Sequence, residues 1–190
     1  MLDRVVEIDE QILLWIQENI RTDIFSPIMK GFTYIGNGGA IMIFACFILI
    51  IVPKTRKLGI LGACALAANV LVNNLVIKNL VGRTRPYEVI EGLKLMIRKQ
   101  SDYSFPSGHS SAAFALASVI YIETPRKIGI PSMILATVIA LSRLYVGVHY
   151  PTDVIGGMIT GTLLGCLTCY IFHKKIKSKK RLFRQPKTEQ

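Results

Sequence analysis

Hydrophobic residues in this chain occur in long, nearly uncharged runs, which cover 58–77, 107–122, 128–146 and 154–172. A helix needs about 20 predominantly apolar residues to cross the hydrocarbon core of a bilayer. A soluble domain of this size would spread its charges through every segment. The pattern therefore predicts an all-α fold, an integral-membrane helical bundle.

The N-terminal part of the chain departs from this pattern. Residues 4–20 place apolar side chains at helical spacing with acidic residues opposite, so they are too charged to span. They predict an amphipathic helix at the membrane interface, a depth that suits Trp15. Residues 24–52 are apolar but are interrupted at Gly36-Asn37-Gly38-Gly39. We expect five to six transmembrane helices plus the N-terminal amphipathic helix.

Small and polar residues within the runs predict contacts between helices. Three glycines recur every four residues in the last run, and such a stripe lets a neighbouring helix approach closely. Three asparagines in the 58–77 run should face other helices rather than lipid. The glycines are Gly157, Gly161 and Gly165, and the asparagines are Asn69, Asn73 and Asn74.

Positive charge is concentrated at the C-terminus. The net charge is +11, and residues 174–190 contribute +7 of it through eight basic residues against one acidic residue. Basic segments next to a span stay on the cytoplasmic side, so nucleic-acid binding is disfavoured. We predict three parts: an interfacial helix at 1–24, a membrane domain at 25–173 and a basic cytoplasmic tail at 174–190.

The orientation of the bundle follows from a cytoplasmic tail. The basic turns at 54–57 and 126–127 then also lie inside. Residues 78–103 and 147–152 lie outside, together with the N-terminal helix if it does not span. Within the first outer segment, apolar residues of 87–103 follow helical spacing, so part of this loop is expected to lie flat on the membrane surface.

Lys78 and Arg85 form the first of three polar clusters near the membrane edge. They are seven residues apart, two helical turns, and are expected to point the same way. Two cations held together suit an anion with several oxygens, because arginine offers a planar fork and lysine a point charge. The alternative for this segment alone is that both side chains extend to the interface.

Ser107, Gly108 and His109 form the second cluster, at the start of an apolar run. A helix N-terminus presents free N–H groups to phosphate oxygens. Gly108 would let the backbone come close, Ser107 would donate a hydroxyl and His109 would give a proton. An ordinary helix cap explains Ser107 but not His109.

The third cluster runs from Ser142 to Asp153 and contains Arg143 and His149. Pro151 favours the first turn of a helix, which places Asp153 within reach of the imidazole of His149. A carboxylate on one ring nitrogen leaves the other nitrogen free to attack. Arg143 is a further candidate phosphate ligand.

Together these clusters resemble the signature of the phosphatidic acid phosphatase type two superfamily, KxxxxxxRP, PSGH and SRxxxxxHxxxD. All three motifs are complete between Lys78 and Asp153. The similarity is to the compact bacterial members, of the phosphatidylglycerophosphatase B and undecaprenyl-diphosphatase type. It implies a bundle of membrane helices with a phosphatase site that needs no metal or cofactor.

The resemblance also implies a role for each residue. His149 would attack phosphorus to give a phosphohistidine, Asp153 would orient it, and His109 would protonate the leaving oxygen. The phosphoryl oxygens would be held by Lys78, Arg85, Ser107, Gly108 and Arg143.

The sequence thus predicts a lipid phosphatase in a bacterial plasma membrane, with the active site on the extracytoplasmic face. The substrate classes implied are undecaprenyl diphosphate, phosphatidylglycerol phosphate and phosphatidate. The alternative is a transporter or lipid-binding protein that holds a phosphate group without hydrolysis. Such a protein would also need Lys78, Arg85 and Arg143, but not two histidines and an aspartate.

Overall fold

The computed structural model describes residues 2–36 and 39–182, and every regular element in these residues is helical. The all-α prediction is confirmed. The elements in chain order are α1 (Leu2–Asn19), α2 (Phe25–Ile35), α3 (Ala40–Ile51), α4 (Arg56–Asn69), the π-helical segment η2 (Val70–Ile77), α5 (Lys78–Val81), α6 (Pro86–Val89), α7 (Gly108–Glu123), α8 (Arg126–Tyr145) and α9 (Pro151–Leu182).

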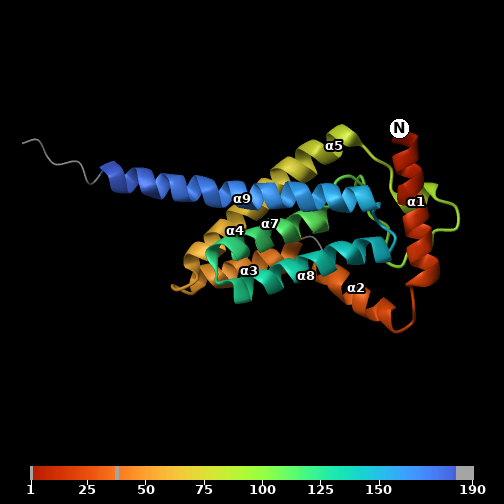
Figure 1. Ribbon diagram of the computed structural model, residues 1–190, viewed down its shortest axis with the longest axis horizontal. Coiled ribbons are helices and arrows are strands. Elements are labelled where there is room, and N and C mark those ends of the chain that lie inside the picture. Colours follow the sequence, from red (N-terminus) through yellow and green to blue (C-terminus); the bar gives the residue numbers. More distant parts are fainter. Residues whose placement is uncertain (1, 37–38, 183–190) are drawn as a thin grey trace, which may run out of the picture.

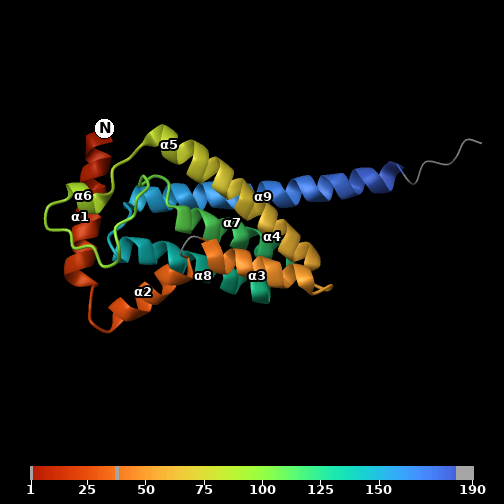
Figure 2. The same ribbon diagram turned by 180° about the vertical axis from the view of Figure 1, so that it is seen from behind.

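The long helices form an elongated bundle around α7, which packs against α4, α8 and α9 (Figure 1). The loop between α5 and α7 and the short connection between α8 and α9 lie at one end of the bundle, beside α1 (Figure 2). The turns that join α3 to α4 and α7 to α8 lie at the opposite end. All the predicted site residues belong to segments that meet at the α1 end.

Close packing between α7 and α9 depends on the predicted glycine stripe. A Cβ atom added at Gly161 would lie only 2.2 Å from the carbonyl oxygen of Ser111 in α7. The corresponding distances at Gly157 and Gly165 to α7 carbonyl oxygens are 2.6 and 2.5 Å. The helix backbones are therefore in direct contact, as expected for a stripe of small residues. This contact sets the position of the first turn of α7 relative to the first turn of α9.

Three stretches of the described residues are long and apolar enough to cross a membrane: Arg56–Val89, Arg126–Tyr145 and Pro151–Lys175. The pair α2 and α3, bent by 55°, makes a fourth if it is one span. The chain is thus a membrane protein, while the count of five to six spans stays a prediction. The bend runs over residues 37 and 38, which lie outside the described residues. Helix α7 has 16 residues, nine of them buried, so other helices rather than lipid cover much of its surface.

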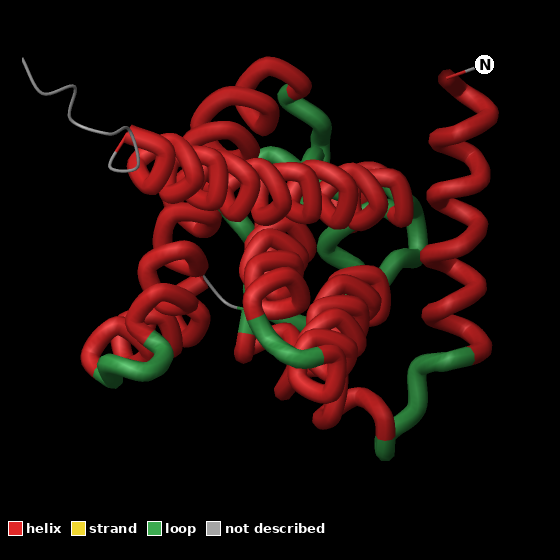
Figure 3. Tube along the Cα trace, turned by 60° about the vertical axis from the view of Figure 1, so that its left-hand side comes forward, coloured by secondary structure: helices red, strands yellow, loops and turns green. Residues whose placement is uncertain are grey.

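Helix α1 stands as a separate column across one end of the bundle (Figures 1 and 3). It contacts α8 and α9, and it buries Leu13 and Asp9 while Trp15 and Ile8 are exposed. This amphipathic arrangement agrees with the helix expected at 4–20. Its position at a membrane interface stays a prediction.

The loop at 87–103 differs from expectation. Only α6 is helical there, and Gly92 adopts a left-handed conformation with φ of +80°. Ile90 and Leu93 are buried, and the backbone N–H of Met96 donates to the carbonyl oxygen of Val146 over 3.2 Å. The helical spacing of these apolar residues does not form a helix beyond Val89, because Ile90 and Leu93 pack onto the bundle, and the position of the loop at a membrane surface stays a prediction.

The predicted tail at 174–190 begins within α9, which continues to Leu182, and its residues 183–190 lie outside the described residues.

Asn69 and Asn73 are buried and joined by a 2.7 Å hydrogen bond, so their orientation toward other helices is confirmed. Asn74 is half-buried and lines a cavity.

Candidate active site

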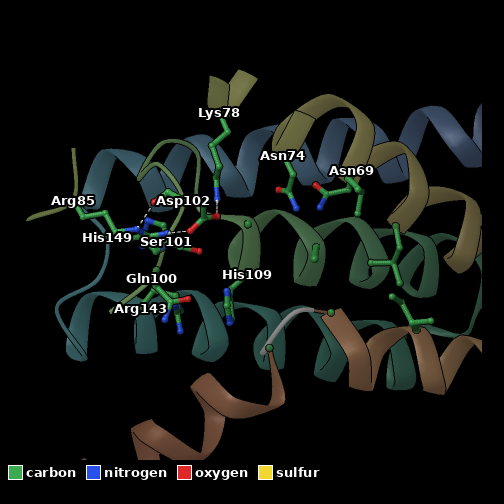
Figure 4. A pocket seen from close by; sticks show the side chains of 17 residues that line it. Asn69, Asn74, Lys78, Arg85, Gln100, Ser101, Asp102, His109, Arg143 and His149 are labelled. Atoms are coloured by element: carbon green, nitrogen blue, oxygen red, sulfur yellow. Dashed lines mark hydrogen bonds and ion pairs between the residues drawn. The ribbon is translucent and has the colours of Figure 1, made fainter. Parts of the chain in front are cut away.

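A cavity of roughly 320 Å³ opens at the α1 end of the bundle (Figure 4). Two of the eight predicted site residues, Ser107 and Asp153, lie behind its wall and are fully buried. The structure therefore brings the three sequence clusters to one place. The six that line the cavity are Lys78, Arg85, Gly108, His109, Arg143 and His149.

Lys78 and Arg85 meet in the cavity, but not because they share a helix. Helix α5 ends at Val81, Gly82 follows in a left-handed conformation with φ of +59°, and Arg85 has extended backbone. The expectation of two continuous helical turns was wrong. The glycine ends the helix, and the loop that follows brings the side chain of Arg85 to the cavity that Lys78 also lines.

Asp102 joins these two cations. Its carboxylate accepts hydrogen bonds from the ammonium of Lys78 and, over 2.6 Å, from NH2 of Arg85. Burial alone would raise the pKa of Asp102, but the charges and hydrogen bonds of Lys78 and Arg85 outweigh it and lower that pKa to about 2. Asp102 is therefore a permanent anion placed where both cations converge.

The Ser107 to His109 segment opens α7 as predicted. Ser107 is the N-cap residue, and its hydroxyl oxygen accepts from the backbone N–H of Ser110 over 3.4 Å. Its N–H donates to the carbonyl oxygen of Asp153 over 3.0 Å, which ties α7 to α9. Gly108 faces Lys78 and leaves the first turn of the helix open to the cavity. Ser107 thus serves as a cap in this structure, and its proposed hydroxyl donation to phosphate stays a prediction.

Arg143, in the last turn of α8, reaches the cavity from the side opposite Lys78 (Figure 4). Its NH1 donates to the hydroxyl of Thr33 over 3.1 Å, and Thr33 in turn pairs with Ser142 over 2.9 Å. All three side chains are buried. Helix α2 therefore helps to hold the guanidinium of Arg143 in position.

His149 lies in the short loop before α9, and Asp153 lies in the first turn of that helix, as the sequence predicted. Nδ1 of His149 is 3.4 Å from Oδ2 of Asp153, and Nε2 faces the cavity, 3.4 Å from NH1 of Arg85. Burial lowers the pKa of His149 despite its contact with Asp153, and Arg85 and Arg143 lower it further. The imidazole is therefore neutral at physiological pH, the form that can act as a nucleophile.

Three polar atoms in the cavity wall are buried and have no partner among the described residues. They are Oδ1 of Asn74, Nε2 of His109 and Nε of Arg143. Buried polar atoms in native proteins nearly always have a hydrogen-bond partner. A bound anion with several oxygens would supply one to the two nitrogens if Nε2 of His109 carries a proton, and it would also contact Lys78 and Arg85.

Residues that are not signature positions of the three motifs complete the site. Arg83 lies within the first motif at a position the signature leaves open, and the others reach the motif residues from distant segments, so spacing could not predict their contacts. Within the described residues, no group of three or more His, Cys, Asp or Glu side chains is placed to bind a metal ion. The additional residues are Asp102, Thr33, Ser104, Arg83 and Asp9.

Comparison with known proteins identifies the family. The family model described as "PAP2 superfamily" matches residues 57–177, well over half of the chain. The chain belongs to the PAP2 superfamily. The solved structure of a transmembrane PAP2 type phosphatidylglycerolphosphate phosphatase from Bacillus subtilis is similar, with a TM-score of 0.75 and 27% identity over 90% of this chain and 87% of that chain. The predicted resemblance is confirmed.

Two curated relatives, both undecaprenyl-diphosphatases, match part of this chain. An undecaprenyl-diphosphatase from Sulfolobus acidocaldarius is 32% identical over 65% of this chain and 60% of its own length. An undecaprenyl-diphosphatase from Bacillus subtilis is 34% identical over 57% of this chain and 53% of its own length. The chain thus spans little more than half the length of these relatives.

Proposed function

We propose that this PAP2 protein is a metal-independent lipid phosphatase that works through a phosphohistidine on His149. One observation carries the proposal. Nε2 of His149 faces a cavity in which buried nitrogen atoms of His109 and Arg143 lack partners, and the side chains of Lys78 and Arg85 converge on the same space. Phosphoryl transfer depends mainly on positioning and on stabilising negative charge, which such a cavity would supply.

The proposed reaction has two steps. Nε2 of His149 attacks phosphorus and forms an N–P bond while the bond to the leaving oxygen breaks, and His109 gives that oxygen a proton. A water molecule then attacks phosphorus and breaks the N–P bond, while His109 takes the proton of the water. Asp153 orients the imidazole through Nδ1 in both steps.

The substrate is proposed to be a phosphomonoester or diphosphate of a membrane lipid. The cavity continues past His109 between apolar side chains, Ile43, Leu66 and Val70, and two of these are exposed on the outside of the bundle. A lipid tail could thus stay in the bilayer while its phosphate reaches His149. Undecaprenyl diphosphate, phosphatidylglycerol phosphate and phosphatidate all meet this requirement, and the names of the relatives favour the first two.

The proposed setting is a bacterial plasma membrane, with the active site on the extracytoplasmic face and the C-terminus in the cytoplasm. The basic turns and the basic end of α9 lie at the end of the bundle opposite the cavity, which is the distribution that the positive-inside rule requires. Residues 1–24 would then be the interfacial helix, 25–173 the phosphatase domain and 174–190 the cytoplasmic tail.

The test is release of inorganic phosphate by the purified protein in detergent from a panel of lipid phosphates. The wild-type protein should release phosphate from at least one lipid, with EDTA present, and His149→Ala should release none. A protein that binds lipid phosphates but releases no phosphate from any of them is a transporter or binding protein instead.

A further inference from the structure

Arg83 lies in the loop between α5 and α6, and its side chain contacts two distant parts of the chain, helix α1 and the segment 150–153. Its NH1 donates to Oδ1 of Asp153 over 2.7 Å and to the hydroxyl of Thr152 over 2.6 Å. Its NH2 donates to Oδ2 of Asp9, in α1, over 2.8 Å. The guanidinium also lies over the ring of Tyr150, 3.8 Å from its centroid. One side chain thus connects the N-terminal helix with the carboxylate beside His149.

Asp9 is buried, although most of α1 is exposed. Besides Arg83, its carboxylate accepts from the backbone N–H of Thr152 over 3.1 Å and from the hydroxyl of Thr152. A buried carboxylate costs several kcal/mol unless it is paired. Replacing a whole buried ion pair with apolar residues is often neutral or stabilising, whereas removing only one partner is destabilising. Stability alone therefore explains the presence of the Asp9–Arg83 pair poorly.

The hydrogen bonds of Asp153 indicate what Arg83 does. Oδ1 is held by Arg83 at 2.7 Å, and Oδ2 is held by the hydroxyl of Ser104 at 2.5 Å and by the N–H of Tyr150 at 3.0 Å. Nδ1 of His149 is farther away, at 3.4 Å. The position of the carboxylate is thus set by Arg83 and Ser104, and His149 takes the orientation that this carboxylate allows.

We infer that Arg83, held by Asp9, is a positioning residue that aims Asp153 at His149. The guanidinium of Arg83 is held between two carboxylates, that of Asp153 and that of Asp9. Because Asp9 belongs to the N-terminal helix, this helix completes the active site. Arginine can bridge two carboxylates through separate nitrogens of one planar group, which the single ammonium of lysine does not reproduce. The inference rests on the proposed phosphatase function.

A direct contact between Arg83 and the substrate phosphate is the competing possibility, because Arg83 also lines a neighbouring cavity. Both of its terminal nitrogens, however, already donate to carboxylates. The proposed phosphate ligands Lys78 and Arg85 also pair with a carboxylate, but theirs is the half-exposed Asp102, whereas the partners of Arg83 are buried. The contacts of Arg83 are those of a residue that orients another side chain.

The experiment compares Arg83→Gln, Arg83→Lys and Asp9→Asn with the double variant Asp9→Asn/Arg83→Gln. Arg98→Gln is the matched control, because Arg98 is an exposed arginine in the loop between α6 and α7, at the same end of the bundle. Rapid quench with a radiolabelled lipid phosphate gives the rate of phosphoenzyme formation, steady-state assays give KM, and thermal unfolding in detergent checks the fold of each variant.

A misplaced Asp153 should slow phosphoenzyme formation about 10- to 100-fold in Arg83→Gln while KM stays within about twofold of wild type. Arg83→Lys should not restore the rate. Asp9→Asn, which keeps the shape of the side chain, should have a smaller effect, and the double variant should match Arg83→Gln alone. Arg98→Gln should behave as wild type.

Other outcomes would overturn the inference. A higher KM with an unchanged rate would make Arg83 a substrate ligand, and additive effects would mean that Asp9 does not act through Arg83. A lower unfolding temperature with normal phosphoenzyme formation would leave both residues a purely structural role. Failure of the wild-type protein to release phosphate would instead contradict the proposed function.

Discussion

Gly161 lies where α9 comes closest to α7, so Gly161→Ala should disturb both stability and activity. The added Cβ atom would lie 2.2 Å from the carbonyl oxygen of Ser111 and 2.9 Å from its Cα and carbonyl carbon. Ordinary contact distances begin near 3.5 Å, so the helices must separate by roughly 1 Å. Backbone atoms cannot move aside as a flexible side chain would. Overpacking of this kind costs about 1–3 kcal/mol of the free energy of unfolding.

The same displacement should reach the active site. The α7–α9 contact holds the turn that bears His109 beside the turn that bears Asp153, and a shift of about 1 Å in a catalytic group can cost about 100-fold in rate. Gly161→Ala should therefore lower phosphate release about 10- to 100-fold and lower the unfolding temperature in detergent.

Gly31→Ala is the matched control. Gly31 also lies within a helix, but a Cβ atom there would have nothing within 4 Å. Alanine in a helix interior is favoured over glycine by about 0.5–1 kcal/mol, so this variant should be as stable as wild type or slightly more so, with normal activity. A Gly161→Ala protein with wild-type stability and activity would refute the argument that backbone contact between α7 and α9 holds the site together.

Three further predictions concern the site and the orientation of the chain. Asp102→Asn should strengthen inhibition by orthovanadate about fivefold, because it removes a carboxylate that competes with the anion for Lys78 and Arg85. The control Glu88→Gln should leave this inhibition unchanged. Weaker inhibition of the Asp102→Asn protein would show that the carboxylate organises the two cations instead. In a cysteine-free background, a membrane-impermeant thiol reagent on whole cells should label a cysteine placed at Glu91 but not one at Arg126, and the reverse pattern would invert the topology. His109→Ala should slow turnover most with a poor alkoxide leaving group such as that of phosphatidate, and an equal loss for a nitrophenyl phosphate would remove His109 from the role of general acid.

The sequence predicted the elements and motifs whose signals are local. Runs of apolar residues indicated helices, and a glycine every four residues indicated that a neighbouring helix, α7 in the structure, packs closely against α9. Pro151 and Ser107 marked the starts of α9 and α7, because their preferences act within one helical turn. His149 and Asp153 are four residues apart, so their contact could be expected as soon as a helix was placed there.

Contacts between distant segments could not be predicted in this way. Asp102 and Thr33 carry no motif, and their partners lie 24 and 110 residues away along the chain. In the loop at 87–103, Ile90 and Leu93 are buried against the bundle. The apolar spacing within the loop could not predict this, because it carries no information about the surface of the bundle. Gly82 is the instructive case, since one left-handed residue ended the helix that was expected to align Lys78 with Arg85.

The most direct test of the proposed mechanism is to trap the phosphoenzyme. A radiolabelled lipid phosphate would be mixed with the enzyme and quenched rapidly, under alkaline conditions because phosphohistidine is labile in acid. The wild-type protein should carry label on His149, and His149→Ala should carry none with any substrate. Label retained on the His149→Ala protein, or located on another residue of the wild-type protein, would contradict the account.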